Sequence, residues 1–238
     1  MARDFGGGFV PDPAEVKSLF ARIAPCYDLL NHLFSARRDL FWRRSAARAV
    51  KPVVEGPILD LACGTLDQTV ALARAYPLRP VIGVDFSLPM IRRGRPKLSR
   101  LNSHGVGLAV GDGLHLPFAG QAFAAATISF GIRNLPDRGL ALAELCRVLK
   151  PGGRLAVLEL GLPVGPIAGI YLFYLKKLLP RLARPISGRG ADYDYLVRSI
   201  LEFPRPAQFL KMMARAGFSA QALPLTQGIC WLFVGQKG

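Results

Sequence analysis

Short apolar runs alternate with segments of helical periodicity from about residue 57 onward, and this alternation constrains the fold more than any other feature. The runs are rich in Val, Ile and Leu and are too short for buried helices. We predict strands over residues 58–62, 80–85, 106–110, 124–130 and 154–160. Apolar strands separated by helices are typical of a parallel sheet covered on both faces. The sequence therefore predicts an α/β fold with a doubly wound, mostly parallel sheet.

The segments between these strands, and the end of the chain, complete the expected architecture. We predict helices over residues 67–76, 88–102, 137–149 and 205–216. Asp137 is a suitable N-cap for the third helix, and Lys-Pro-Gly-Gly at 150–153 is a stop signal for it. The runs FSAQALPL and GICWLFVG, joined at residues 226–228, predict an antiparallel hairpin on the sheet edge.

Two regions lie outside the regular strand and helix pattern. The first 50 residues have apolar positions at three-to-four spacing and predict a helical N-terminal cap. Residues 162–203 form an insertion between the fifth strand and the last helix. We expect a single domain over 1–238, with a cofactor-binding core at 57–160, a substrate lid at 162–203, and the C-terminal helix and hairpin at 204–238.

Composition excludes several classes of protein. An apolar fraction of 51% with 20% charged residues excludes a disordered or fibrous chain, and no 18-residue stretch is apolar enough to be a membrane helix. The four cysteines stand far apart without a Cys-x-x-Cys pair, and the three histidines form no ligand motif, so we expect no metal. The first residues resemble neither a secretion signal nor an import leader, so we expect a cytoplasmic protein.

A glycine turn after the first strand is the best local signal of a binding site. The segment LDLACGTLD, residues 59–67, ends a strand and opens a helix, so the turn at Gly64 presents backbone N–H groups at the carboxyl edge of the sheet. Leu66 and Thr69 stand where a dinucleotide fingerprint requires glycines. The turn therefore does not favour a pyrophosphate ligand.

Acids follow the next two strands at the same edge. Asp85 ends the second strand and is placed to accept hydrogen bonds from two ribose hydroxyls, and Asp112 with Gly113 follows the third strand, where an acid suits an adenine amino group. Acids at these positions, without a phosphate-binding loop, indicate a site for an adenosine that carries no phosphate. S-adenosylmethionine is the cofactor that we predict.

Longer motifs resemble those of the ubiquinone/menaquinone biosynthesis C-methyltransferase family. The weakly specific ones, Lys-Pro-Gly-Gly and the acid after the second strand, are shared by many class I methyltransferases. The more specific ones are Phe-Gly-Ile-Arg-Asn at 130–134, Tyr-Asp-x-x-Asn at 27–31 and Ser-Ile-x-x-Phe-Pro at 199–204. The resemblance spans almost the whole chain and implies a seven-stranded sheet, S-adenosylmethionine as cofactor, and methylation of a ring carbon on a polyprenyl quinol.

The resemblance also assigns residues. The family's cofactor contacts fall on Thr65, Asp85, Asp112, Gly113 and Ser129, in addition to the glycine turn at Gly64. Its proposed catalytic group falls on Tyr27, Arg133 and Asn134.

The chain departs from the family pattern at two positions. Cys26 precedes Tyr27 where a basic residue is common, and Leu66 replaces a glycine. If the loop keeps the family's path, Leu66 either adopts a left-handed backbone or turns its isobutyl group toward the methionine portion of the cofactor, at a cost of about 1–2 kcal/mol. Alternatively, it belongs to a rebuilt right-handed turn and packs under the helix that starts at Asp67.

The chemistry of a quinol indicates what the catalytic residues must do. A quinol hydroxyl has a phenol-like pKa of about 10, and loss of its proton pushes electron density onto the ring carbon that attacks the methyl group. Arginine is not a free base at neutral pH. We therefore expect Arg133 and Asn134 to hold a water that takes the proton, or to stabilise the phenolate.

The formal net charge of +15 requires a separate account. It favours an anionic membrane surface, an acidic partner or nucleic acid. The run of basic residues between Arg92 and Arg100 fits a solvated helix face. The segment IAGIYLFYLKKLLPRLARPI mixes apolar and basic residues, as do a membrane-surface helix and a lid over an apolar substrate, and a core helix is the alternative.

Three functions are compatible with the sequence. Quinol C-methylation at the inner face of the membrane comes first. An RNA methyltransferase would use the basic charge, but residues 131–134 lack the Asn/Asp-Pro-Pro-aromatic motif of amino-methylating enzymes, so a nucleic-acid substrate is not favoured. A methyltransferase acting on another small molecule belongs to the same alternative. A non-catalytic assembly protein of the same fold is the third, and homodimer formation stays open.

Overall fold

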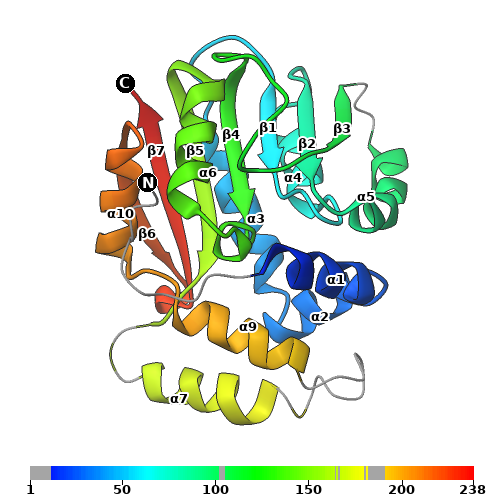
Figure 1. The fold of residues 1–238 in the computed structure, drawn as a ribbon, viewed down its shortest axis with the longest axis vertical. Coiled ribbons are helices and arrows are strands. Elements are labelled where there is room, and N and C mark those ends of the chain that lie inside the picture. Colours follow the sequence, from blue (N-terminus) through cyan, green and yellow to red (C-terminus); the bar gives the residue numbers. More distant parts are fainter. Residues whose placement is uncertain (1–11, 102–104, 164, 166, 180, 182–190) are drawn as a thin grey trace.

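The computed structural model describes residues 12–101, 105–163, 165, 167–179, 181 and 191–238. Its centre is a seven-stranded sheet in the order β3-β2-β1-β4-β5-β7-β6 (Figure 1). The strands are β1 (Ile58–Leu61), β2 (Val81–Asp85), β3 (Val106–Val110), β4 (Phe123–Ser129), β5 (Leu149–Leu160), β6 (Phe218–Leu225) and β7 (Cys230–Lys237). The first five are parallel, and β7 is antiparallel to both of its neighbours. The predicted fold class and the C-terminal hairpin are confirmed.

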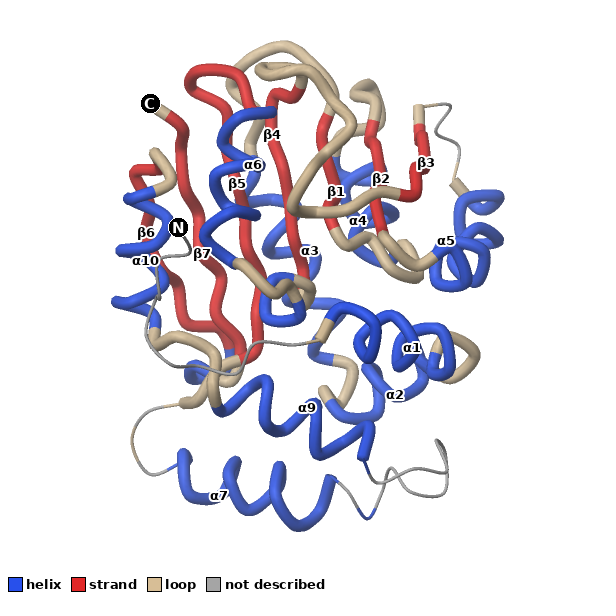
Figure 2. Tube along the Cα trace, in the orientation of Figure 1, coloured by secondary structure: helices blue, strands red, loops and turns tan. Residues whose placement is uncertain are grey.

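Helices cover both faces of the sheet (Figure 2). They are α1 (Pro13–Ile23), α2 (Tyr27–Phe34), α3 (Arg38–Val50), α4 (Asp67–Ala75), α5 (Leu88–Gly94), α6 (Arg138–Val148), α7 (Ile167–Phe173), α9 (Ala191–Leu201) and α10 (Pro206–Arg215). One core cluster joins the sheet to α6 and α10, and another joins its opposite face to α3 and α4. All seven residues of β4 are buried, as expected for a central strand between two helical layers.

The elements outside this sandwich gather at one end of the sheet. Figure 1 shows α1, α2, α7 and α9 beyond the carboxyl ends of the parallel strands. The helix α7 continues as a π-helical turn over Tyr174–Leu178, whose inner residues pack on α9. No helix in the described ranges is long and apolar enough to cross a bilayer.

Two predicted boundaries were wrong for identifiable reasons. The helix expected over 88–102 ends at Gly94 and gives way to a 3-10 helix over Arg95–Arg100, because Pro96 has no N–H for an α-helical bond. The helix before Lys-Pro-Gly-Gly ends at Val148, as predicted, but the fifth strand begins at Leu149 rather than at residue 154, so residues 150–153 belong to β5. The pairing there shifts from Phe123↔Leu149 to Ala125↔Arg154, so these residues form an irregularity at the start of the strand.

Candidate active site

A pocket of about 550 Å³, counting the part open to solvent, lies at the carboxyl ends of β1, β2 and β4. Because β1 stands between β2 and β4, the connections after β1 and β4 diverge and leave a crevice, which is where open α/β sheets bind ligands. The residues that line it are Phe20, Tyr27, Leu61, Ala62, Gly64, Asp85, Phe86, Met90, Gly111, Gly113, Ser129, Phe130, Gly131, Asn134 and Leu135.

Asp85 provides a buried carboxylate in this pocket. Its side chain accepts a hydrogen bond from the backbone N–H of Gly64 at 2.8 Å and another from that of Ser87 at 2.8 Å. Each carboxylate oxygen keeps a further lone pair, so both can still accept from ligand hydroxyls. Burial raises the pKa of Asp85 to about 6, against the two backbone hydrogen bonds that lower it. The group is therefore mostly ionised at neutral pH.

The turn after β1 excludes the right-handed backbone considered for Leu66 but has the buried side chain expected with it. Its backbone is left-handed, with φ of 70°, and its side chain is fully buried against Cys63 and Ile91 rather than in the pocket. Gly94 permits this packing, since a Cβ there would lie 2.5 Å from the carbonyl carbon of Thr65 and 2.6 Å from Leu66 Cγ. The leucine therefore does not fill the space available to a ligand.

Thr65 lies close to the pocket, but its hydroxyl serves another contact. The side chain is 2% exposed, and Oγ1 donates to Asp28 Oδ1 at 2.5 Å. Lys97 Nζ lies 2.7 Å from Asp28 Oδ2 and 2.5 Å from Asp67 Oδ1. This Asp28 network ties α2 to the glycine turn and to the start of α4. It also shows that Lys97, in the basic run, does not lie on a solvated helix face.

The acid after β3 does not enter the pocket. The Asp112 side chain is 61% exposed, and its Oδ1 accepts from the backbone N–H of Leu114 at 2.9 Å, which closes a tight turn. Gly111 and Gly113 on either side line the pocket instead. The structure thus brings Gly113 to the site and places the Asp112 carboxylate outside it.

Ser129 provides an observation that points to a ligand. Its residue is 6% exposed and lines the pocket, and its Oγ is buried without a hydrogen-bond partner among the described residues. A buried hydroxyl without a partner costs about 1–3 kcal/mol, and a polar ligand would remove that cost. Together with the Asp85 carboxylate and the glycines at 64, 111 and 113, it fits a ribose and an adenine ring.

Aromatic rings also line the pocket. Tyr27 lines it and packs edge-on against Phe20, with ring centroids 6.0 Å apart. Phe20 also packs edge-on against Phe86, with ring centroids 6.3 Å apart. Because these rings come from α1, α2 and the end of β2, the N-terminal helices form one wall of the site.

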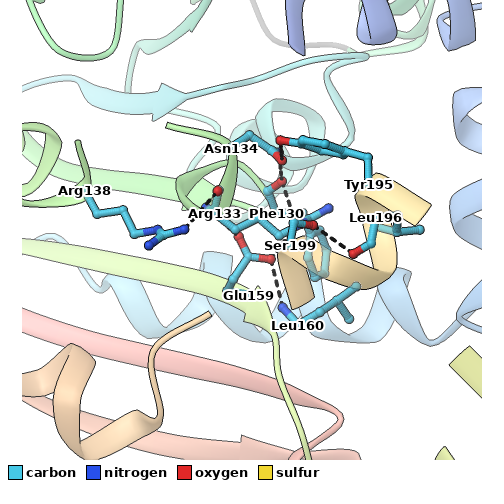
Figure 3. A network of polar contacts seen from close by, with 9 residues as sticks. All are labelled: Phe130, Arg133, Asn134, Arg138, Glu159, Leu160, Tyr195, Leu196 and Ser199. Atoms are coloured by element: carbon cyan, nitrogen blue, oxygen red, sulfur yellow. Dashed lines mark hydrogen bonds and ion pairs between the residues drawn. The ribbon is translucent and has the colours of Figure 1, made fainter. Parts of the chain in front are cut away.

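Arg133 is not among the residues that line this pocket. Its Nη1 is 2.5 Å from Glu159 Oε1 and 2.9 Å from the carbonyl oxygen of Phe130 (Figure 3). Burial lowers the pKa of Arg133, but the Glu159 carboxylate outweighs that effect, so the pKa lies above its ordinary value. The guanidinium stays charged, and Arg133 cannot be the base that removes a substrate proton.

Asn134 does reach the pocket, and two contacts orient its amide. Nδ2 donates to the Phe130 carbonyl at 3.3 Å, and Oδ1 accepts from the Tyr195 hydroxyl of α9 at 3.0 Å (Figure 3). Burial raises the pKa of Tyr195 to about 12, so its hydroxyl keeps its proton and donates. The second N–H of Asn134 remains for a ligand oxygen. Phe130, which receives both side chains on its carbonyl, has a left-handed φ of 59°.

Comparison with known proteins assigns the family. The sequence model of the ubiE/COQ5 methyltransferase family matches residues 10–237. The chain belongs to this family. It is 45% identical over 223 residues to a protein of Syntrophotalea carbinolica named ubiquinone/menaquinone biosynthesis C-methyltransferase UbiE, covering 93% of each chain. It is 43% identical to the demethylmenaquinone methyltransferase of Thermus thermophilus, covering 92% of this chain and 100% of that one.

Solved structures support the fold. The [4+2]-cyclase SpnF superimposes with a TM-score of 0.67 at 16% identity and covers 98% of both chains. That likeness concerns architecture alone, because one scaffold carries many reactions. The assignment to the ubiE/COQ5 methyltransferase family therefore rests on sequence, and the chemistry must be argued from the site.

Sequence reasoning missed several residues of this family member's site. Glu159 had a signal, since it is the one acid in an otherwise apolar run that ends at the carboxyl edge. Tyr195 had none, because only the folded chain brings α9 to Asn134. Lys97 was hidden within a basic run, and its acidic partners come from two distant segments.

Proposed function

We propose that this protein transfers a methyl group from S-adenosylmethionine to a ring carbon of a polyprenyl quinol, the reaction class for which its relatives are named. One observation carries the proposal. A single pocket is lined by a buried carboxylate, an unpartnered hydroxyl, a tyrosine and an oriented amide. The carboxylate and the hydroxyl suit an adenosine, which we place at one end, and the tyrosine and the amide suit the hydroxyl of an aromatic substrate, which we place at the other.

The residues at the first end would hold the cofactor. Asp85 would accept from the ribose hydroxyls, each charged hydrogen bond contributing about 1.5–3 kcal/mol. Ser129 would supply a hydroxyl, and the glycines at 111 and 113 would let the adenine approach the backbone. S-adenosylmethionine, when bound, supplies an electrophilic methyl group on a positively charged sulfur.

The residues at the second end would activate the quinol. Asn134 would donate its free N–H to the quinol oxygen, which favours the phenolate as the hydroxyl proton leaves to water. Tyr27 would offer a second polar contact beside the ring. The Arg133 guanidinium is neutralised by Glu159, so its contribution would be to hold the Phe130 carbonyl, which Asn134 also contacts. The ring carbon would gain the methyl group as the methyl–sulfur bond of the donor breaks and leaves a neutral thioether, and loss of the ring carbon's own proton to water would restore aromaticity.

The walls of the site would exclude bulk water while leaving room for the water that takes the hydroxyl proton. Phe20, Tyr27 and Phe130 surround the substrate end, and the Asp28 network holds α2 in place above the glycine turn. Exclusion of bulk water strengthens the electrostatic contacts inside the pocket and prevents solvent from screening the phenolate charge. Leu66 does not obstruct the pocket, which disfavours a non-catalytic role.

We further propose that the protein works at the inner face of an anionic membrane, through the outer face of α7. Ile170 is 71% exposed and Phe173 63% exposed. Lys176 and Lys177 follow on the same segment and are also exposed. Exposed apolar residues beside lysines are the features of an interfacial helix, where each basic residue contributes about 1 kcal/mol at an anionic surface.

A methylation assay tests the catalytic proposal. Purified protein with S-adenosylmethionine and chemically reduced demethylmenaquinol is expected to form menaquinol, detected by mass spectrometry. Calorimetric titration of S-adenosylmethionine, with the Asp85→Ala variant as control, separates loss of binding from loss of chemistry. Absence of binding at millimolar cofactor would refute the proposal, and methylation of RNA but of no quinol would assign a different substrate.

Vesicle sedimentation tests the membrane proposal. The protein is expected to sediment with vesicles that contain phosphatidylglycerol and to leave them as salt rises. Lys176→Glu with Lys177→Glu should abolish this binding. Arg74→Glu with Lys211→Glu makes the same change of net charge at exposed positions on other helices and should retain most of it. Equal loss in both double variants would mean that net charge, not α7, drives binding.

A further inference from the structure

A second cavity lies beside the candidate active site. It encloses about 590 Å³, counting the part open to solvent, between α3, α9 and the segment that continues from α7. Its walls are mainly apolar and aromatic, and they include Trp42, Tyr171, Leu175, Leu179, Leu196 and Ile200. This volume is in the range of small-molecule sites.

The two cavities meet at the loop after β4. Phe130 lines both of them, Arg133 lines the second, and the next residue, Asn134, lines the first. The second cavity therefore lies next to the loop that carries Asn134. A ligand whose ring lies beside Asn134 has this cavity within reach of its substituents.

Most polar groups of the second cavity are already paired. Asp39 accepts from the hydroxyl of Ser35 at 2.8 Å and lies 2.9 Å from Nδ1 of His32. Arg133 is bound to Glu159. Two donors differ, since Asn31 Nδ2 and Arg133 Nε are buried without a partner among the described residues. The cavity thus offers an apolar space with few free donors, which fits a hydrocarbon and excludes a nucleotide or a peptide backbone.

We propose that the second cavity binds the first isoprene units of the substrate's polyprenyl chain while the quinol ring lies beside Asn134. The inference rests on the proposed function and extends it, because it gives the insertion at 162–203 a role in substrate recognition. An isoprene chain has no polar atoms, and cavities with apolar linings do not hold ordered water, so the chain would fill a space that water leaves.

The location also explains how α9 contacts both parts of the substrate. Tyr195 of α9 orients Asn134, and Leu196 and Ile200 of the same helix line the cavity. The Tyr174 hydroxyl donates to the carbonyl of Phe34 at 2.9 Å, which joins the other wall to α2. The isoprene site and the ring site therefore share rigid supports.

Kinetics with two substrates test the proposal. We would compare 1,4-naphthoquinol carrying a geranyl chain with the same quinol without a chain. Wild-type protein is expected to have a KM at least tenfold lower for the geranyl substrate. Ile200→Phe, which fills the cavity from a position that is 1% exposed, should raise the geranyl KM at least tenfold and the chain-free KM less than twofold. Ile170→Phe, on the outer face of α7, is the matched control and should change neither.

A binding measurement gives a readout that does not depend on activity. Trp42 lines the cavity, and Trp231 is the other tryptophan of the chain. In the Trp231→Phe variant, geraniol is expected to shift the emission of Trp42, and Ile200→Phe should remove the shift. Calorimetric affinity for S-adenosylmethionine should be unchanged, which shows that both variants are folded.

The outcomes separate this inference from the proposed function. Equal KM values for both substrates, or an Ile200→Phe effect of equal size on both, would overturn the isoprene site and leave the methyl transfer standing. Failure to methylate either quinol would overturn the proposed function, and the geraniol titration would still decide whether the cavity binds an isoprenoid. An unchanged Trp42 emission at saturating geraniol would overturn the site directly.

Discussion

The guanidinium of Arg133 is joined to the carboxylate of Glu159 at 2.5 Å, with side chains 7% and 0% exposed. Glu159 also accepts from the backbone N–H of Leu160 at 2.9 Å and from that of Arg133 at 3.3 Å. The loss of one partner would leave a buried charge without compensation, at a cost of about 3–5 kcal/mol. The pair is therefore a structural requirement as well as a candidate part of the catalytic group.

We predict that Arg133→Ala lowers the melting temperature as well as turnover, because Glu159 is left unpaired. The double variant Arg133→Met with Glu159→Leu should recover most of the stability but not turnover, which is expected to stay at least a hundredfold below wild type. Thermal unfolding and single-turnover kinetics make the comparison. Recovery of turnover in the double variant would show that Arg133 serves packing alone.

We predict that affinity for S-adenosylmethionine falls as the pH drops below about 6. The pKa of Asp85 is raised to about 6, so its carboxyl is protonated below that pH and loses the charge that accepts the ribose hydroxyls. The dissociation constant should be about tenfold larger at pH 5 than at pH 7 by calorimetry. Asp85→Ala should bind at least tenfold more weakly at pH 7 and lose this pH dependence. Burial also raises the pKa of Asp60 to about 6. Because Asp60 remains in the Asp85→Ala variant, that variant is an internal control for the titration of Asp60.

We predict that Leu66→Gly destabilises the protein without improving cofactor binding. Glycine relieves the left-handed strain of about 1–2 kcal/mol, but truncation of a buried leucine costs about 2–5 kcal/mol. The melting temperature should fall by several degrees, and the dissociation constant for S-adenosylmethionine should change less than threefold. A fivefold gain in affinity at unchanged stability would show that the leucine distorts the cofactor site.

We predict that Asp28→Ala loosens the N-terminal helices. The substitution removes the acceptor of the Thr65 hydroxyl and one of the two acids at Lys97, so the free energy of unfolding should fall by about 1–2 kcal/mol. Hydrogen exchange should rise in residues 13–34, and cofactor affinity should weaken. Ser18→Ala, which removes an exposed hydrogen bond within α1, is the matched control. Unchanged exchange in Asp28→Ala would mean that the aromatic contacts alone hold the cap.

The sheet was predictable because parallel strands buried on both faces are short, continuous apolar runs. For the same reason Asp85 was predictable, since an acid at the end of such a run lies at the ligand edge of the sheet. Asp112 follows a strand in the same way, yet a hydrogen bond to Leu114 N closes its turn and directs the carboxylate to solvent. The position of a strand end is a property of the sequence pattern, whereas the direction of a side chain depends on local turn geometry.

The polar network around Arg133 was not predictable in the same way. Arg133 and Asn134 were identified from a motif, but their partners Glu159 and Tyr195 lie 26 and 61 residues further along the chain. No local spacing links such positions, because the fold packs both β5 and α9 against the 3-10 turn over Ile132–Asn134. For this reason Arg133 does not line the pocket as expected: its guanidinium is paired with Glu159, and Asn134 lines the pocket instead.

The candidate active site and the second cavity are built from different parts of the chain, and this difference bears on how such enzymes diversify. Asp85, Gly64, Gly113 and Ser129 belong to the strand and helix core, whereas the walls of the isoprene cavity come largely from α3, α9 and the segment after α7. Substitutions in those outer segments can alter which acceptor molecule is recognised while the core that holds the methyl donor stays intact. Selection can therefore act on acceptor choice and on donor affinity almost independently, and libraries built on residues 162–203 are the place to begin redirecting this scaffold to new aromatic acceptors.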